Sequence, residues 1–344
     1  MTQFITIDIS VNIIKIDRNV IILMSNVTYI AIFIPYDERI IIVIEKNNMK
    51  IGIDSYCFHR LFGEVYPHQD APENTVSMDQ FLDEIFQWDI DGVSLESCFF
   101  PNFTSAYLTT VKDRLDARGL DRVYAWGHPD GLEAGGNRAA FYEMIEHIDY
   151  AVAIGAKVMR VVASSLMFRF EPHEPQLKTL TQWFKEAVII AEKKGVILAI
   201  ENHIDYNSDE LLKLLQDVDS PYLGINFDSG NFLRVLDDPV KAMAKLAPYV
   251  HATHIKDLLP APGVSVDEWY FFSCVPTGEG LIDNLRIGQM LEEVNFDGFM
   301  AVEIDTLHPD YFGQEIRVIK ESILELRHLS DVINSEAAQK QALA

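Results

Sequence analysis

A chain of 344 residues with 49% apolar residues can bury a large core, and this length is compatible with one long α/β domain or two smaller ones. A formal net charge of −24 makes nucleic acid and anionic membranes poor partners, because both are negatively charged. The three cysteines, Cys57, Cys98 and Cys274, are odd in number and far apart, which disfavours a disulfide framework or thiolate zinc site and favours a reducing, cytoplasmic location.

Residues 1–48 differ in composition from the rest of the chain, with 15 isoleucines and no glycine. Their most apolar stretch, residues 20–34, contains polar residues and is shorter than the roughly 20 residues of a membrane helix; no signal-peptide pattern is present. Two interpretations stay open. The segment is a β-rich extension, since isoleucine and valine favour strands, or a spurious extension upstream of a true start at Met49. We favour the second and assign these residues no chemistry.

From Met49 onward, strand-length apolar runs alternate with helix-length amphipathic stretches, many of them preceded by Ser, Thr, Asp or Asn. The expected strands are 50–54, 92–97, 122–129, 157–164 and four runs that end at Glu201, Asp228, His254 and Glu303; the expected helices are 77–89, 104–118, 137–154, 175–194, 208–218, 237–249, 283–295 and 311–329.

Eight such pairs predict a (β/α)8 TIM barrel over residues 49–330, followed by a polar tail, 331–344, that we expect to fray. An open doubly wound sheet would need a glycine-rich phosphate loop after the first strand. The sequence there, IDSYCFHR, has none.

The last four expected strands each end in a residue that can bind a metal: Glu201, Asp228, His254 and Glu303, at intervals of 27, 26 and 49 residues. Because the C-terminal ends of barrel strands meet at one face, we expect these side chains to converge on a divalent ion. Three carboxylates and one imidazole suit Mn²⁺ best, with Mg²⁺, Co²⁺, Fe²⁺ or Zn²⁺ as alternatives. The weaker explanation is that each acidic residue only caps the following helix.

Glu201 and Glu303 have a second predicted role. From strands five and eight they could lie on opposite sides of a substrate carbon, so that one carboxylate removes a proton next to a carbonyl and the other returns one. Both are therefore the candidate catalytic residues.

Five residues are candidates for substrate contacts: His203, Lys256, His128, Glu96 and His59. His203 and Lys256 each follow a predicted ligand by two residues and so point the same way along extended backbone. Glu96 and His128 end the second and third strands, and His59 lies in the long first loop. Alternatives are a hydrogen-bonded loop histidine for His203 and a turn-stabilising role for His128.

The loop 260–280 explains the interval of 49 residues and carries four consecutive aromatic residues, 269–272. A loop this long is usually functional or disordered, and its aromatic content disfavours disorder. It could be a lid, a subunit contact or part of the core. Asp257, just before it, could be a turn residue or a partner of the ligands.

The ordered phrases AIENH, NFDSGN, HATHIKD, PTGEG and AVEID resemble the xylose-isomerase-like barrels, specifically the sugar phosphate isomerase and epimerase family, over residues 49–330. That family also includes ketose epimerases, inosose dehydratases and dehydroshikimate dehydratases. The resemblance implies that Glu201, Asp228, His254 and Glu303 hold a divalent ion, and that the two glutamates exchange protons with substrate. It further implies that His203 and Lys256 touch substrate oxygens.

The leading expectation is a metal-dependent isomerase or epimerase that acts on a sugar or polyol-derived carbonyl compound through a metal-stabilised enediolate. The alternative is a lyase of the same superfamily, either a dehydratase or the catalytic subunit of a C-glycoside deglycosidase, which performs β-elimination on a keto-sugar. A homo-oligomer and a small partner subunit both stay open. An endonuclease IV-like nuclease is disfavoured by the acidic charge, and a non-catalytic sugar-binding protein by the ligand set.

Overall fold

The computed structural model describes residues 29–32, 41–44 and 48–343. The chain divides into two units, one of residues 49–333 and one of residues 1–48 with 334–344. In the latter, strands β1 (Tyr29–Ile32) and β2 (Ile41–Ile44) pair antiparallel. Most of the N-terminal extension lies outside the described residues, so both interpretations of it stay predictions.

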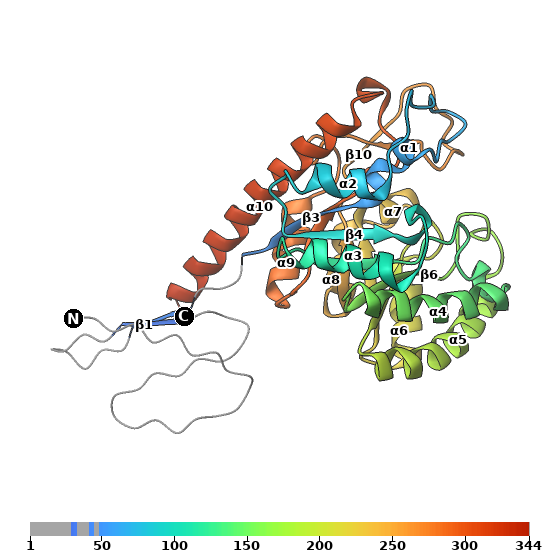
Figure 1. Ribbon diagram of the computed structural model, residues 1–344, viewed down its shortest axis with the longest axis horizontal. Coiled ribbons are helices and arrows are strands. Elements are labelled where there is room, and N and C mark those ends of the chain that lie inside the picture. The colour runs from blue at the N-terminus through green and yellow to red at the C-terminus, as the bar shows by residue number, and fades with distance from the viewer. Residues whose placement is uncertain (1–28, 33–40, 45–47, 344) are drawn as a thin grey trace. The chain divides into compact units, whose positions relative to one another are not determined.

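Eight parallel strands form the larger unit, with helices on their outer side (Figure 1). In barrel order they are β12 (Phe299–Val302), β3 (Lys50–Asp54), β4 (Gly92–Glu96), β5 (Asp121–Ala125), β6 (Val158–Val162), β7 (Ile197–Glu201), β8 (Leu223–Asp228) and β9 (Val250–His254).

Ile255, just beyond β9, joins the two ends of this sheet. Its N–H donates to the carbonyl of Ala301 at 2.7 Å, and its own carbonyl accepts the N–H of Glu303 at 3.2 Å. The Thr253 hydroxyl adds a bond to the carbonyl of Phe299 at 3.0 Å. The predicted TIM barrel is therefore confirmed.

The outer helices are α2 (Met78–Ile85), α3 (Ser105–Asp116), α4 (Arg138–Ala153), α5 (His173–Lys194), α6 (Ser208–Val218), α8 (Pro239–Leu246), α9 (Asn284–Glu293) and α10 (Glu315–Leu343). Ser77, Thr104 and Asn137 cap α2, α3 and α4 by accepting backbone N–H groups, as expected from their side chains. The last helix does not end near residue 329 as expected but runs on to residue 343. None of the helices in the described ranges has the length and apolarity that a membrane span requires.

Shorter elements lie in the loops. They are α1 (His59–Phe62), α7 (Ser229–Arg234), the 3₁₀ helices η1 (Ser55–Phe58), η2 (Ser97–Phe99), η3 (Glu133–Gly135), η4 (Ala247–Tyr249) and η5 (Pro309–Tyr311), and the hairpin strands β10 (Leu258–Pro260) and β11 (Phe272–Cys274). The hairpin accounts for much of the loop 260–280.

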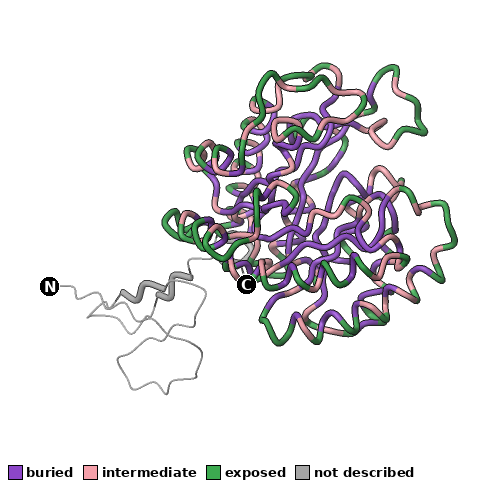
Figure 2. The backbone as a smooth tube through the Cα atoms, turned by 45° about the vertical axis from the view of Figure 1, so that its right-hand side comes forward, coloured by how far each residue is buried: buried purple, intermediate pink, exposed green. Residues whose placement is uncertain are grey.

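Buried residues fill the space between strands and helices, and exposed ones lie on the outer turns (Figure 2). Inside the barrel, a second apolar cluster of Val123, Ala252, Phe299 and Ala301 closes the bottom. The Phe299 ring occupies the space that a Cβ atom on Gly52 or Gly92 would need. Residues two positions further along these strands point to the same interior, nearer the C-terminal end. Polar residues at the C-terminal ends of the strands therefore face a cavity, and the apolar cluster lies beneath it.

One irregularity determines which residues meet. Between β8 and β9, Ile225 pairs with Val250 but Asn226 pairs with Ala252, so β9 carries one extra residue, His251. The bulge places Asp228 opposite His254.

Candidate metal centre and active site

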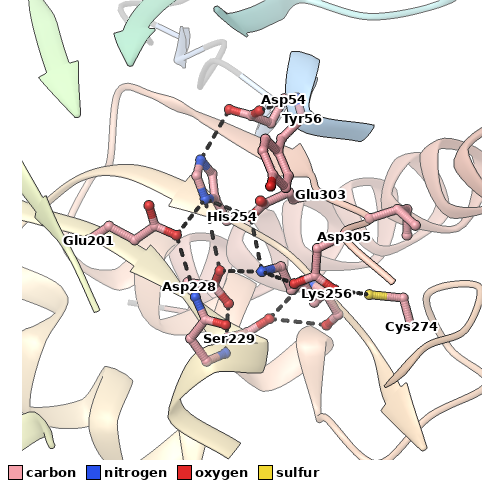
Figure 3. Close-up of polar contacts among 12 residues, drawn as sticks. Asp54, Tyr56, Glu201, Asp228, Ser229, His254, Lys256, Cys274, Glu303 and Asp305 are labelled. Atoms are coloured by element: carbon pink, nitrogen blue, oxygen red, sulfur yellow. Dashed lines mark hydrogen bonds and ion pairs between the residues drawn. The ribbon is translucent and has the colours of Figure 1, made fainter. Parts of the chain in front are cut away.

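Glu201, Asp228, His254 and Glu303 come together at the C-terminal end of the barrel, each with a ligand atom within 4.8 Å of the others (Figure 3). All four are buried. Nδ1 of His254 lies 2.7 Å from Oε2 of Glu303, 3.2 Å from Oε1 of Glu201 and 3.9 Å from Oδ2 of Asp228. The structure thus brings together the four side chains that the strand-end pattern selected.

The chemistry of this donor set fits a divalent ion. Glu201 Oε2, Asp228 Oδ2 and Glu303 Oε2 are buried and form ion pairs, with Arg160, Lys256 and His254 respectively, but no hydrogen bond in the described part of the chain. Three buried carboxylates that converge on one imidazole are a donor set that hard divalent cations prefer. The geometry is therefore consistent with a divalent ion. It does not select one metal over another.

Asp54, at the end of β3, orients the imidazole. Its Oδ2 lies 3.2 Å from Nε2 of His254, on the side of the ring opposite to the carboxylates, while its Oδ1 accepts the N–H of Tyr56 at 2.6 Å. The two atoms lie at ion-pair distance without forming a hydrogen bond, so Asp54 places a negative charge beside Nε2 while Nδ1 faces the centre.

Two asparagines hold the ligand-bearing strands together. The side-chain amide of Asn202 donates to the carbonyl of Asp228 at 2.8 Å and accepts the N–H of the same residue at 2.9 Å. Asn231, in α7, donates its backbone N–H to Oδ1 of Asp228 at 2.8 Å. The residues next to the ligands in AIENH and NFDSGN therefore fix where the carboxylates point.

Lys256 lies at the same centre and is buried. Its Nζ is 2.7 Å from Oδ2 of Asp228, 3.2 Å from Oε2 of Glu303 and 2.8 Å from Oδ2 of Asp305. Burial disfavours its charge, but these carboxylates outweigh burial and raise the pKa of Lys256 well above its usual range. Lys256 is therefore a fixed positive charge beside the proposed ligands.

Arg160, on β6, crosses the barrel interior between two glutamates. Its guanidinium contacts Glu96, and its Nε lies 2.9 Å from Oε2 of Glu201. Burial works against ionisation of Glu201, but Arg160 and His254 outweigh it and hold its pKa well below the ordinary value. Burial has the larger effect on Glu96 and raises its pKa to about 8.

A cavity of about 410 Å³ opens above this centre. Glu201, Glu303, Lys256, Glu96, His128 and His203 all contribute to its lining. Asp205 shapes the loop of His203 by accepting the N–H groups of His203 and Tyr206 at 3.0 and 2.7 Å. Nδ1 of His203 is buried without a hydrogen-bond partner among the described residues. His128 also accepts the N–H of Asp130 at 3.3 Å, so its turn role and a substrate contact are compatible.

The structure places His59 elsewhere. It lines a separate cavity of about 260 Å³, and its ring nitrogens lie 2.8 Å from the carbonyl oxygen of Glu64 and 2.6 Å from that of Asp305. Because both ring nitrogens face backbone oxygens, His59 shapes the first loop and does not reach the larger cavity.

Aromatic residues from two loops meet at the cavity. The Tyr56 hydroxyl lies 2.5 Å from that of Tyr66 and donates to Oε1 of Glu64 at 2.8 Å. Trp269, from the β10–β11 connection, packs edge-on against Tyr66, with ring centroids 5.1 Å apart. Trp269 therefore forms part of the cavity wall from within its own chain.

Asp257, just before β10, anchors the segment that follows β11. Its carboxylate accepts the backbone N–H groups of Leu258, Gly278, Gly280 and Ile282 at 2.9 to 3.1 Å. A Cβ atom on Gly280 would lie 2.1 Å from Oδ1 of Asp257, so the PTGEG phrase needs glycine at this position.

Residues 82–326, more than half of the chain, match the family described as the xylose isomerase-like TIM barrel. The chain belongs to this family. The xylose isomerase-like barrels that it resembles include dehydratases and an epimerase-like protein.

Among curated proteins, the inosose dehydratase of Clostridium beijerinckii is 24% identical over 220 residues, which cover 58% of this chain and 74% of the relative. The inosose dehydratase of Clostridium perfringens is 27% identical over 183 residues, which cover 47% of this chain and 62% of that protein. Among solved structures, a D-tagatose 3-epimerase-like protein has a TM-score of 0.64 at 18% identity, covering 84% of this chain and all of the other. The IolI protein with a bound zinc atom has a TM-score of 0.63 at 17% identity, covering 84% and 99%. These structural likenesses establish the shared fold.

Sequence reasoning missed four polar residues of this xylose isomerase-like barrel: Asp54, Arg160, Arg234 and Asp305. A lone arginine in the apolar run VMRVV and an aspartate closing the first strand were signals for two of them. Arg234 and Asp305 form a buried ion pair, in which Nη2 of Arg234 donates to Oδ1 of Asp305 at 2.8 Å.

Proposed function

We propose that this chain is a divalent-metal-dependent lyase that removes a proton next to the carbonyl of a keto-sugar or keto-polyol and expels a β-hydroxyl group as water. The unequal surroundings of Glu201 and Glu303 carry this proposal. Oε2 of Glu201 meets Arg160, and its Oε1 meets His254 and Asn231. Glu303 directs Oε2 at His254 and Lys256, which leaves Oε1 as the oxygen available to a substrate in the cavity. One free carboxylate suits a reaction with one base.

In this scheme Glu303 takes the proton from the carbon next to the carbonyl. Lys256, 3.2 Å from Oε2 of Glu303, holds this carboxylate in position and keeps it ionised for the proton transfer. When bound at the four ligands, a divalent ion supplies Lewis-acid polarisation of the carbonyl. His203, His128 and Glu96 line the cavity and hold substrate hydroxyl groups.

Tyr56 is the proposed proton donor to the departing hydroxyl. Its phenol lies in the cavity wall beside Tyr66 and Glu64. A phenol is protonated at neutral pH, so it can donate a proton as the carbon–oxygen bond breaks. The carbon–hydrogen electron pair then forms the new double bond, and the hydroxyl leaves as water.

Isomerisation or epimerisation is the second candidate. It is favoured by the fact that Glu201 and Glu303, from different strands, both line the cavity, which is the arrangement that two-base proton exchange uses. It would require Glu201 to exchange a proton in spite of Arg160.

Incubation of the metal-loaded protein with a panel of keto-sugars and cyclic keto-polyols in deuterated water separates these reactions. We expect a product that has lost one water molecule, detected by mass spectrometry. Deuterium incorporation with otherwise unchanged mass would instead support epimerisation, and no reaction with any member would contradict both. A Tyr56→Phe variant should slow dehydration about 10²-fold or more, whereas Tyr142→Phe, on an exposed helix surface, should not.

A further inference from the structure

The positive charges that line the main cavity are all engaged by the protein itself. Arg234 is the clearest case. Its Nη1 donates to Oδ2 of Asp305 and to Oδ1 of Asn231, its Nη2 donates to Oδ1 of Asp305 and to the carbonyl of Phe272, and its Nε donates to that carbonyl too. A guanidinium has five N–H donors, so none is left for a ligand.

Lys256 and Arg160 are also paired with buried carboxylates. The three N–H donors of Lys256 face three carboxylates, those of Asp228, Glu303 and Asp305. Arg160 contacts Glu96 and Glu201 and donates to the carbonyl of Trp126 at 3.1 Å. Within the described chain, these three are the cations of the cavity lining, and the charge of each is offset by at least one buried carboxylate.

Carboxylates outnumber these cations. Five of them line the cavity: Glu64, Glu96, Glu201, Glu303 and Asp305. Even with Glu96 protonated, four carboxylates face three cations. An incoming phosphate or carboxylate group would therefore meet like charge on several sides.

The remaining polar groups suit hydroxyls. Nδ1 of His203 is buried without a partner in the described residues, and Tyr56 and Tyr66, whose hydroxyls bond to each other, also line the cavity. Histidine and tyrosine both donate and accept, as a sugar hydroxyl does. Leu166 and Trp269 provide apolar surface for the carbon face of a ring.

Because the cations of the lining are engaged by carboxylates and its other polar side chains suit hydroxyl groups, we infer that the substrate is an uncharged polyhydroxylated ketone. The site then discriminates against phosphate esters and carboxylic acids of the same carbon skeleton. The inference rests on the proposed function, because it takes this cavity as the active site. A divalent ion at the four ligands attracts oxygen anions, but in a substrate ketone the reacting carbonyl and its neighbouring hydroxyl occupy its open positions. A charged group elsewhere on the substrate would need a cation of its own, and the lining supplies none.

Calorimetric titration of the metal-loaded protein tests this directly. The probes are a cyclic polyol, its phosphate monoester and a polyhydroxylated cyclohexane carboxylate, none of which can undergo elimination. We expect the neutral polyol to bind at least about tenfold more tightly than either anion. Tighter binding of an anion, or no binding of the neutral polyol, would overturn the inference. Binding without turnover of the corresponding ketones would instead count only against the proposed reaction.

A charge variant sharpens the test. Glu64→Gln keeps an acceptor for the Tyr56 hydroxyl but removes one negative charge from the lining, so the preference for the neutral probe should fall about two- to fivefold. Glu73→Gln, an exposed residue of the same loop outside the cavity lining, is the matched control and should leave the preference unchanged. An equal effect of both variants would show that net charge, and not the cavity, sets the preference.

Discussion

Nε of Arg160 lies 2.9 Å from Oε2 of Glu201 inside the barrel, and the same guanidinium contacts Glu96 on the other side. Both glutamates are buried. The arginine therefore helps to keep Glu201 ionised in the interior, whereas burial still raises the pKa of Glu96 to about 8. With Arg160 on Oε2 and His254 on Oε1, Glu201 has both oxygens engaged, whereas His254 and Lys256 hold Glu303 at Oε2 and leave its Oε1 for substrate.

Replacing Arg160 with methionine should lower the free energy of unfolding by about 3–5 kcal/mol, because it leaves buried carboxylates without a cation. Denaturant unfolding measures the effect, and adding Glu96→Gln should restore part of it. The control Arg286→Met breaks an exposed pair with Glu293 and should cost less than about 1 kcal/mol. Equal losses in the two single variants would contradict the buried-pair role.

The four-ligand set predicts separate effects on metal and turnover. Asp228→Ala should lower the metal content per chain measured by elemental analysis, since it removes one of the converging ligand atoms. Asp310→Ala, an exposed aspartate, is the control and should keep the metal content. An unchanged metal content in Asp228→Ala would remove that residue from the site.

Replacing each glutamate with glutamine, which has nearly the same shape, tests whether its charge is needed for turnover. Glu201→Gln and Glu303→Gln should leave a folded barrel and lower turnover about 10²–10⁴-fold, because an amide cannot carry the proton or the charge. Circular dichroism checks the fold. Normal turnover in Glu303→Gln would exclude that residue as the base, and normal turnover in Glu201→Gln would exclude a requirement for its charge at the metal site.

The barrel and the four strand ends were predictable because both are local properties of the sequence. Alternating apolar runs indicate strands, and the last residue of each run reaches the C-terminal face whichever strand lies beside it. Glu201 and Asp228 could therefore be selected without knowing any contact.

The remaining parts of the site depend on contacts between distant segments. Arg160 acts only because β4 and β7 place Glu96 and Glu201 on either side of it. The extra residue in β9, which sets His254 opposite Asp228, has no signal in the apolar pattern. His59 was expected at the substrate because it follows the first strand, but the path of its loop directs it to the carbonyl of Asp305.

Lys256→Met should separate charge from metal binding. The change removes a cation that touches two of the proposed ligands, Asp228 and Glu303, so metal should still bind while turnover falls about 10²-fold or more. Without metal, the variant should have a lower melting temperature than the wild type, and added metal should raise it by a larger amount, because the ion compensates the buried negative charge that Lys256 no longer offsets. Loss of metal together with activity would show that Lys256 supports the ligand set.

The contact between α5 and α6 predicts a pH-dependent stability. Nδ1 of His173 lies 2.7 Å from Oε1 of Glu210, and its Nε2 lies 2.9 Å from the carbonyl oxygen of Arg169. Burial disfavours the charged ring, but Glu210 and Arg169 outweigh burial and raise the pKa of His173 above its ordinary value. Only the protonated ring can donate to both oxygens.

Because the pKa of His173 is higher in the folded than in the unfolded chain, protonation of its ring stabilises the fold. This stabilisation is fully present below the unfolded pKa of about 6.5 and is lost as the pH rises through the folded pKa. His173→Gln should therefore cost about 0.5–1 kcal/mol at pH 5.5 and much less at pH 9, measured by denaturant unfolding at both values. His251 provides the control with the opposite sign. Burial lowers its pKa, so its contribution to stability is greatest at high pH, and the free energy of unfolding of His251→Gln should fall furthest below that of the wild type there. A pH-independent loss in His173→Gln would mean that the ring contributes packing and not charge.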